Sequence, residues 1–420
     1  MTPRTRIVLA GAVGNIVEWY DFGLYGLMAP VLATLFFHSQ DRIASLLGAY
    51  GGFAVGFAMR PIGAVVLGRV GDRQGRQFVL VLSVVLMGIS TVAIGLLPTY
   101  QTIGVLAPIL LIVIRLFQGF SVGGEFVGSV TYLVETANEG RRGLAGSVAN
   151  LGATIGMLLA AAAGSLGEIR PQFWRVPFLF GGVLALVGFL LRRHLPPDEY
   201  LKSEQAEESR QEKKDKTKGW PAFQAFRNIP RTMIVATLFT CGYGVSNYVT
   251  MVFLPTFGRE FANIPESLAL RINSAGQALA LVVVPLSGFV SDRFLKRRTL
   301  LSAAFLLQAL LTWELFSLVI KKEAAGLWVA QLLLAGLLAV IMGAAPAMLS
   351  EQFPPEMRVS GHAFVLNVGI GIAGGSAPLV AVALIRATAN KMAPAAYLIA
   401  ACILSATAVL FLQDRSRKTL

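Results

Sequence analysis

The sequence has few cysteines, few histidines and few charged residues. Its 420 residues include 2 cysteines and 3 histidines, and only 14% are Asp, Glu, Lys or Arg. Cys241 and Cys402 both lie in apolar stretches, which excludes a disulfide framework, and His38, His194 and His362 lack the spacing of metal ligands. Soluble proteins carry about a quarter charged residues, so a soluble globular enzyme is excluded on composition.

Apolar residues dominate instead, at 55% of the chain. A bilayer core about 30 Å thick is crossed by a helix of roughly 20 apolar residues, so we searched for stretches of that length. The result predicts an all-α membrane protein with twelve transmembrane helices at 7–36, 43–67, 78–97, 102–133, 143–167, 173–193, 230–258, 270–290, 299–320, 325–350, 359–386 and 393–412.

A long polar break separates the first six stretches from the last six. Between Lys202 and Lys218 it is a run of mixed charges without apolar periodicity, which is typical of a solvated linker. We therefore predict an N-terminal six-helix domain at 1–193, a cytoplasmic linker at 194–229 and a C-terminal six-helix domain at 230–420.

The formal net charge of +13 has an uneven distribution along the chain. Most Lys and Arg residues fall in alternate loops, on the side of the predicted bundle that holds both termini. By the positive-inside rule, both termini are then cytoplasmic. The basic excess is explained by topology and by contact with anionic lipid, so no nucleic-acid partner is expected.

Two features occur in both halves at nearly the same offset. GRVGDRQGR at 68–76, after the second stretch, recurs as GFVSDRFLKR at 288–297, after the eighth. A glutamate seven residues before an arginine follows the fourth and tenth stretches, in the pairs Glu135 with Arg142 and Glu351 with Arg358. Such repeats predict a duplicated six-helix plan, which is common among transporters.

Among the charged and amide side chains inside the first predicted spans, six stand out: Glu18, Asp21, Arg60, Arg115, Gln118 and Glu125. A charge in the bilayer core costs several kcal/mol unless it meets a partner or water, so these residues are functional candidates. Arginines can hold a substrate carboxylate, and carboxylates can carry a proton. The alternative is a static network that locks the helices, although buried ion pairs are poor net stabilisers.

The second half holds mainly uncharged polar residues. They could line a cavity or bond between helices, and include Tyr243, Asn247, Tyr248, Asn273, Gln277 and Asn367. Glu314 lies near the end of its span, where an interfacial position is favoured. Glycine runs near Gly119 and from Gly369 to Gly375 predict close helix packing rather than dinucleotide binding, because no strand accompanies them.

Several motifs resemble one family of carriers. GRVGDRQGR is similar to the signature loop of the major facilitator superfamily. GNIVEWYDFGLYG (14–26), MRPIGA (59–64), RLFQGFSVGGE (115–125), 135–143 and WRVPF (174–178) resemble the metabolite:proton symporters, which include carriers of α-ketoglutarate, citrate, shikimate and proline/betaine. The resemblance covers nearly the whole chain. It implies two six-helix domains around a central cavity that opens alternately to each side.

The resemblance also implies roles for particular residues. Those that match family motif positions are Glu18, Asp21, Arg60, Arg115, Glu125 and Arg175. A cytoplasmic charge network that latches the outward-open state is implied at Asp72, Arg73, Arg76, Glu135 and Arg142, with Asp292 and Arg293 in the second copy. Gln77 and Leu295 depart from the signature, which predicts a weaker second latch.

We therefore expect a proton-coupled symporter for uptake of a small carboxylate-bearing metabolite, located in a bacterial inner membrane. Substrate-binding candidates are Arg60, Arg115, Gln118, Arg175, Tyr243 and Asn247, and proton-coupling candidates are Glu18, Asp21 and Glu125. No enzymatic activity, metal or cofactor is expected, because the proton gradient supplies the energy. The expected partners are the substrate, the proton and membrane lipid, around a monomeric chain.

Three alternatives stay open. A zwitterion such as proline or glycine betaine is the first, because the charges in the first six helices are of both signs. A drug/proton antiporter is less favoured, since 152–164 lacks the glycine-proline motif of that class. A non-transporting receptor would show a large extramembrane domain or a decayed polar set, and the sequence has neither feature.

Overall fold

The computed structural model describes residues 3–74, 76–121, 130–131, 133–135, 137–138, 140–165, 171–193, 221–354 and 357–415. Only the backbone is described at 3–12, 65, 68–69, 71–73, 76–77, 171–172, 221–224 and 359. Every regular element that these residues form is helical.

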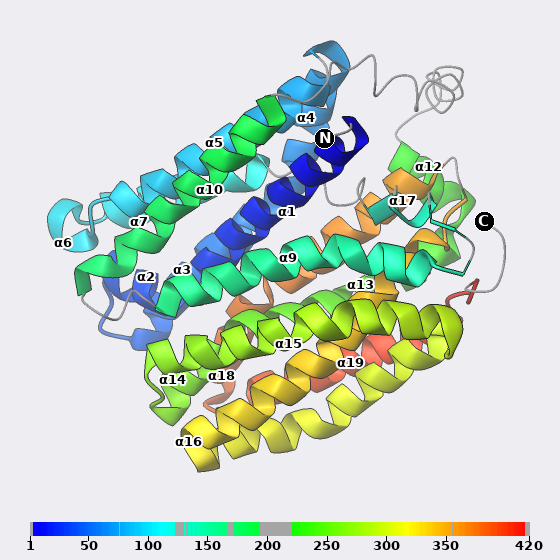
Figure 1. Ribbon diagram of the computed structural model, residues 1–420. Coiled ribbons are helices and arrows are strands. Elements are labelled where there is room, and N and C mark those ends of the chain that lie inside the picture. Colours follow the sequence, from blue (N-terminus) through cyan, green and yellow to red (C-terminus); the bar gives the residue numbers. More distant parts are fainter. Residues whose placement is uncertain are drawn as a thin grey trace.

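The first half forms one bundle, seen in the upper part of Figure 1. Breaks at Met28 and Met59 divide two of its passes, because Pro30 and Pro61 near the next helix start have no backbone N–H. Its elements are α1 (Pro3–Leu27), α2 (Ala29–Phe36), α3 (Arg42–Ala58), α4 (Arg60–Gln74), α5 (Arg76–Leu96), α6 (Tyr100–Ile103), α7 (Leu106–Ser121), α9 (Arg142–Ser165), the 3-10 turn η2 (Pro171–Trp174) and α10 (Arg175–Arg193).

The second half forms the lower bundle of Figure 1. Its α16 contains two antiparallel passes, because the backbone turns at Glu323 (φ 48°). Its elements are α12 (Pro221–Asn228), α13 (Pro230–Tyr248), the π-helical segment η3 (Val249–Phe253), α14 (Leu254–Ala262), α15 (Glu266–Arg293), α16 (Arg297–Ser350), α17 (Arg358–Leu366), the π-helical segment η5 (Asn367–Gly374), α18 (Ala377–Thr388) and α19 (Ala393–Phe411).

The predicted all-α membrane architecture with twelve passes is confirmed. Among the described residues, eight helices are long and apolar enough to cross a membrane, and α7 is a shorter apolar helix. The boundaries differ at the predicted linker, where Pro221–Asn228 forms α12 and 194–220 lie outside the described residues. The division into domains at 1–193 and 230–420 stays a prediction.

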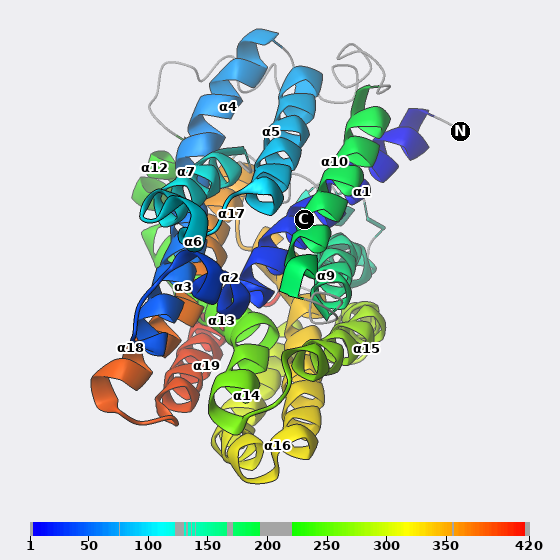
Figure 2. The same ribbon diagram turned by 90° about the vertical axis from the view of Figure 1, so that its left-hand side faces the viewer.

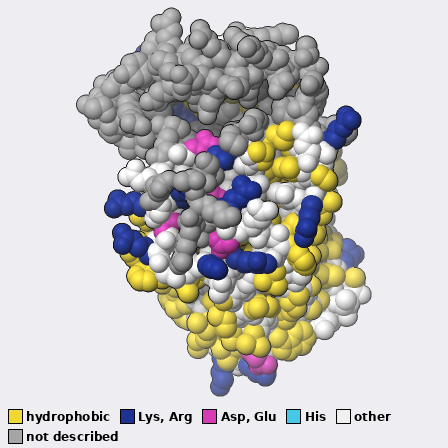
Figure 3. Space-filling model, turned by 90° about the vertical axis from the view of Figure 1, so that its right-hand side faces the viewer, with side chains coloured by type: hydrophobic (Ala, Val, Ile, Leu, Met, Phe, Trp, Pro, Cys, Tyr) yellow, Lys and Arg dark blue, Asp and Glu magenta, His cyan; other side chains and the backbone are white. Residues whose placement is uncertain are grey.

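The passes define two sides of the molecule. α1 begins and α19 ends on one side, which we call the terminal side, and the loops before α3 and before α15 lie on the other, the opposite side (Figure 1). The face on the right of Figure 1, near α12, α17 and the C-terminus, carries scattered Lys and Arg side chains above a hydrophobic region (Figure 3).

The two bundles meet along several helix pairs. α9 of the first half runs beside α15 of the second, and α3 packs against η5 and α18 (Figures 1 and 2). At Gly288 of α15, an added Cβ would lie 2.6 Å from the carbonyl oxygen of Gly143 in α9. The backbones of the two halves therefore touch here, as the small-residue pattern of membrane helices allows.

Close backbone approach also fixes α7 within the first bundle. An added Cβ at Gly119 would lie 1.9 Å from the carbonyl oxygen of Gly56 in α3. At Gly56 itself, a Cβ would lie 2.9 Å from the Arg115 Nη2 atom, so the glycine also leaves room for that guanidinium. The predicted close packing is confirmed at Gly119.

We predict that Gly119→Ala destabilises the fold, because α7 must move away from α3. Overpacking of this kind costs about 1–3 kcal/mol, which lowers the apparent melting temperature of the detergent-solubilised protein by several degrees. Gly51→Ala is the matched control, since nothing lies within 4 Å of its added Cβ. Equal melting temperatures for the two variants would contradict the prediction.

Candidate functional site

A cavity of about 60 Å³ lies between the two halves. From the first half it is lined by Glu18, Trp19, Arg60, Asn150, Ala153, Thr154 and Met157. From the second half it is lined by Tyr243, Asn247, Met251, Gln277, Met342, Leu366, Asn367, Ile370 and Gly371. Charged and neutral polar groups therefore face each other across the cavity.

Arg60, at the start of α4, is the cationic residue of this cavity. Its Nη2 atom lies 3.5 Å from the Glu18 Oε1 atom, and its guanidinium carbon lies 4.1 Å and 4.3 Å from the ring centroids of Phe22 and Phe57. The aromatic faces hold the cation in place. Neither Nε nor Nη2 of Arg60 forms a hydrogen bond with a described residue. A ligand in the cavity can therefore accept from these donors.

A second buried arginine lies behind the cavity wall, on α7. Arg115 is fully buried beside Tyr25, whose ring centroid is 4.2 Å from the guanidinium carbon. Arg115 Nη1 donates to Gln118 Oε1, and Gln118 Nε2 donates to Thr91 Oγ1 at 3.1 Å. The Thr91 hydroxyl in turn donates to Asp21 Oδ1. A continuous polar chain thus connects α7 and α5 to a carboxylate of α1.

Asp21 is 2% exposed, and its Oδ2 atom has no hydrogen-bond partner among the described residues. Thr91, the bridge between Asp21 and Gln118, was not predicted, because one threonine in an apolar span gives no distinguishing signal.

Arg115, Gln118 and Asp21 do not line the cavity. The ring of Phe22 connects Arg115 to Arg60 of the cavity, since its centroid lies 4.1 Å from the guanidinium carbon of Arg60 and 4.9 Å from that of Arg115.

The neutral wall of the cavity comes mainly from the second half. The structure places Tyr243 and Asn247 there as predicted, together with Gln277, whose Nε2 atom has no partner among the described residues. Asn150 and Thr154 of α9 were not predicted, and Asn150 Nδ2 donates to the Met342 carbonyl at 2.6 Å.

Both π-helical segments border the cavity as well. Met251 belongs to η3, and Asn367, Ile370 and Gly371 belong to η5. π-Helical turns inside longer helices are frequent at functional sites, because the extra residue changes the direction of neighbouring side chains.

The structure does not bring Arg175 to the cavity. Its Nη1 atom donates to the carbonyls of Gly95 at 2.6 Å and Leu97 at 3.0 Å, and its guanidinium carbon lies 4.5 Å from the Trp174 ring. These contacts join the first turn of α10 to the end of α5. In this structure Arg175 therefore joins these two helices away from the cavity, and its substrate contact stays a prediction.

Four further predicted residues fall outside what the structure describes. Glu125 lies in the gap at 122–129. Asp72 and Arg73 lie on the backbone of α4 and Arg76 begins α5, but their side chains are not among those described.

On the terminal side, the repeated Glu–Arg pairs bond across the two halves. Glu135 Oε1 lies 2.5 Å from Arg358 Nη1, and Glu351 Oε1 lies 3.7 Å from Arg142 Nη1. Each glutamate therefore pairs with the arginine of the other repeat, a partnership that sequence spacing alone does not reveal.

Asp292 makes a further contact across the halves. Its two carboxylate oxygens accept from the backbone N–H groups of Gly143 at 2.8 Å and Leu144 at 2.9 Å, at the start of α9. An anion is favoured there, because the first N–H groups of a helix have no internal partner.

A basic residue completes this cluster, but it is not the predicted Arg293. Arg293 is exposed, and its nearest described ring is Phe289 at 5.9 Å. Arg297 instead donates to Asp292 at 2.8 Å and pairs with Glu351. The helix α15 ends at Arg293, so the chain must turn before a side chain reaches back to Asp292.

Comparisons with known proteins agree with this architecture. The model of the Major Facilitator Superfamily matches residues 11–378. The chain is 31% identical to the glycine betaine/proline/ectoine/pipecolic acid transporter OusA of Dickeya dadantii (99% of this chain, 84% of that protein). It is 33% identical to the citrate-proton symporter of Salmonella typhi (98% and 96%).

Among solved structures, the D-xylose-proton symporter superposes with a TM-score of 0.78 at 18% identity, over 100% of both chains. The partially occluded, inward-open xylose transporter XylE from E. coli gives 0.75 at 18% identity, over 99% of both chains. These two likenesses concern the fold. Together with the family match, they place this chain in the Major Facilitator Superfamily of membrane transporters.

Proposed function

We propose that this protein is a proton-coupled symporter that takes up a small carboxylate-bearing metabolite by alternating access. One observation carries the proposal: the buried Arg60 faces a cavity between the halves, and its Nε and Nη2 atoms form no hydrogen bond with a described residue, although Nη2 lies 3.5 Å from Glu18 Oε1. Two such donors suit a carboxylate, which accepts from a guanidinium in a bidentate manner. The names of the relatives, a citrate-proton symporter and a betaine/proline transporter, support the same class of substrate.

In this proposal Arg60 binds the substrate carboxylate, and Tyr243 and Asn247 bind the remainder of the molecule. Arg115 and Gln118 do not contact the substrate in this proposal. They form the hydrogen-bonded chain behind the cavity wall that ends at Asp21. Arg175 is left out, since it does not line the cavity and its Nη1 atom donates to two backbone carbonyls.

Asp21 is the leading candidate for the proton, and Glu18 and Glu125 are the others. The Asp21 carboxylate is buried within the first bundle and holds one oxygen atom free of described partners. A carboxylate in such a place changes its proton occupancy when the charge near it changes. Substrate arriving at Arg60 is a change of this kind, and it links the two binding events.

A zwitterionic substrate is the second candidate, favoured by Glu18. The cavity presents one cation and one anion, Arg60 and Glu18, and the rest of its lining is neutral. This pair matches a molecule with one carboxylate and one cationic nitrogen, such as proline or glycine betaine. Trp19 also lines the cavity with Tyr248 stacked on it at 6.5 Å, and an aromatic face attracts a quaternary ammonium.

The proposal also covers the movement of the domains, the location of the carrier in the membrane and its energy source. The six-helix domains at 1–193 and 230–420 move against each other around the linker at 194–229, in a bacterial inner membrane with both termini cytoplasmic. The carrier works as a monomer in contact with lipid, with the proton gradient as its energy source and no cofactor. Support comes from the two bundles and from the Lys and Arg side chains on the face in Figure 3.

The charges on the terminal side are proposed to latch the carrier closed there. Glu135 with Arg358, Glu351 with Arg142 and Arg297, and Asp292 with the start of α9 all join the two halves or brace that joint. The contacts that cross the joint exist only while the halves meet, so they bias the two-state equilibrium without touching substrate. Asp72, Arg73 and Arg76 stay predicted members of this latch.

We predict proton-driven uptake by the purified protein in proteoliposomes. An imposed inward proton gradient is expected to raise the initial uptake of citrate, α-ketoglutarate, shikimate, proline or glycine betaine several-fold above the rate without a gradient. Arg60→Gln is expected to abolish this uptake, whereas Arg271→Gln, an exposed arginine without an ion pair among the described residues, retains it. Equal rates with and without the gradient for every compound would refute proton symport.

We predict that Asp21→Asn uncouples transport from the proton gradient. The amide has the shape of the carboxylate but carries no transferable charge, so accumulation against a gradient is lost while exchange of labelled for unlabelled substrate continues. Glu18→Gln serves as the comparison, because Glu18 lines the cavity and its loss is expected to weaken substrate binding instead. Normal accumulation by Asp21→Asn would remove Asp21 from the proton pathway.

We predict that Glu351→Gln favours the state open on the terminal side. The change leaves Arg142 and Arg297 buried without their shared anion, a loss worth about 3–5 kcal/mol in comparable sites. A cysteine at Gly371, where an added Cβ meets nothing within 4 Å, reports access to the cavity. With Cys241 and Cys402 replaced by alanine, its alkylation by a water-soluble reagent is expected to accelerate at least tenfold.

The matched control is Glu314→Gln. Glu314 is an exposed glutamate of α16 with no ion pair among the described residues. It should leave the alkylation rate unchanged. Identical rates for Glu351→Gln and Glu314→Gln would show that Glu351 does not hold this side closed.

A further inference from the structure

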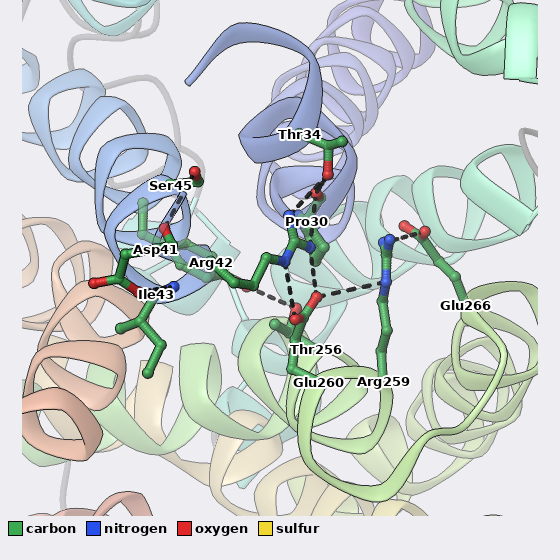
Figure 4. Close-up of polar contacts among 11 residues, drawn as sticks. Pro30, Thr34, Asp41, Arg42, Ile43, Ser45, Thr256, Arg259, Glu260 and Glu266 are labelled. Carbon is green, nitrogen blue, oxygen red and sulfur yellow. Dashed lines mark hydrogen bonds and ion pairs between the residues drawn. The ribbon is translucent and has the colours of Figure 1, made fainter. Parts of the chain in front are cut away.

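The opposite side carries an ion pair between the halves that no sequence motif indicated. Arg42, the first residue of α3, donates from Nε to Glu260 Oε2 at 3.0 Å and from Nη2 to Glu260 Oε1 at 2.5 Å (Figure 4). Glu260 lies in α14, so the bond joins the first half to the second. Two parallel bonds of this kind form the most directional pairing between arginine and a carboxylate.

The side chain of Arg42 is also held by contacts within its own half. Its Nη1 atom donates to Thr34 Oγ1 at 2.8 Å and its Nη2 atom to the Pro30 carbonyl at 3.1 Å, both in α2 (Figure 4). An exposed ion pair usually contributes little, because two flexible side chains must be ordered. Here the ordering of Arg42 is already achieved by α2, so more of the attraction remains available to hold the halves together.

Glu260 has a second basic partner in its own half. Arg259, the preceding residue of α14, approaches Glu260 Oε1 with its Nε atom at 3.5 Å, and its Nη1 atom bonds Glu266 at the start of α15 (Figure 4). Both contacts lie within the second half. They persist when the halves separate, whereas the contact with Arg42 must break.

Two weaker contacts accompany this pair across the joint. Asp41 Oδ2 lies 3.3 Å from Arg386 Nη2 of α18, and the Tyr50 hydroxyl lies 2.7 Å from the Thr256 hydroxyl of α14. A surface pocket of about 560 Å³ reaches Arg42, Arg259 and Glu260. Water and salt can therefore enter the joint as soon as it loosens.

We propose that Arg42 and Glu260 form a strap that closes the carrier on the opposite side, and that Arg259 keeps Glu260 paired when the strap opens. Glu260 then keeps a basic partner without becoming a lone carboxylate, which stabilises the open state relative to the closed one. The strap is the counterpart of the latch on the terminal side. It rests on the proposed alternation of the two halves, but its test measures a distance and requires no transport.

The experiment measures the separation of the halves by pulsed electron paramagnetic resonance. Spin labels are attached at Thr102→Cys on α6 and Lys322→Cys on α16, two exposed positions on the opposite side, with Cys241 and Cys402 replaced by alanine. The full-length protein is recorded under salt conditions in which it populates both a short and a long distance. Each variant is first checked for the elution volume and melting temperature of its parent.

Arg42→Gln is expected to raise the ratio of long to short distances about two- to fivefold, as loss of one partly exposed pair implies. Glu260→Gln should do the same and carries the test if Arg42→Gln fails to fold. Arg271→Gln, on the same side without an ion pair among the described residues, should leave the ratio unchanged. Unchanged ratios for both strap variants would overturn the strap, even in a protein that transports normally.

Arg259→Gln tests the exchange of partners. Without Arg259, Glu260 depends on Arg42 alone and the repulsion between the two arginines disappears, so the ratio is expected to fall towards the short distance. An unchanged or increased ratio would show that Arg259 does not hold Glu260 in the open state. A simple ion pair without exchange would then remain as the description of the strap.

Discussion

The pairing of charges across the two halves is the interaction on which this structure depends. A charge inside a membrane protein is stable only where a partner or water meets it. At both ends of the bundle that partner comes from the other half: Arg358 for Glu135, Arg142 for Glu351, and Arg42 for Glu260. Separating the halves therefore requires these charge pairs to break, and each end has a defined set of closing contacts.

The centre of the molecule follows a different rule. Arg60 and Glu18 pair within the first half, and so do Arg115 and Asp21 through Gln118 and Thr91. The second half faces them with amides, a hydroxyl and methionines. In the proposed alternation, these charged residues therefore move together with the first bundle, and their internal contacts can stay intact while the cavity opens to either side. The proposed substrate would then meet the same cation in both states and a changing neutral wall.

The features that could be predicted from the sequence are those that depend on a single segment of the chain. Bilayer thickness sets the length of an apolar helix, so the passes were found, and the repeated motifs located Asp292, Glu135 and Arg142. Contacts between residues that are distant in the sequence were not predicted. Thr91 resembles any threonine in an apolar span, and Arg42 resembles any basic loop residue. Arg297 was overlooked in favour of Arg293, because the turn that follows α15 decides which of them points back.

The two closures differ in how water reaches them, and this difference gives them different behaviour. On the terminal side the side chains of Arg142 and Glu351, which pair across the halves, are 9% and 0% exposed, so their attraction acts in a dry, weakly screening environment. On the opposite side those of Arg42 and Glu260 are 35% and 12% exposed, within reach of dissolved ions. We therefore expect the pair of Arg142 and Glu351 to respond less to ionic strength than the pair of Arg42 and Glu260. In the proposed cycle, a change in screening then acts mainly on the opposite side and leaves the buried pair of Arg142 and Glu351 intact.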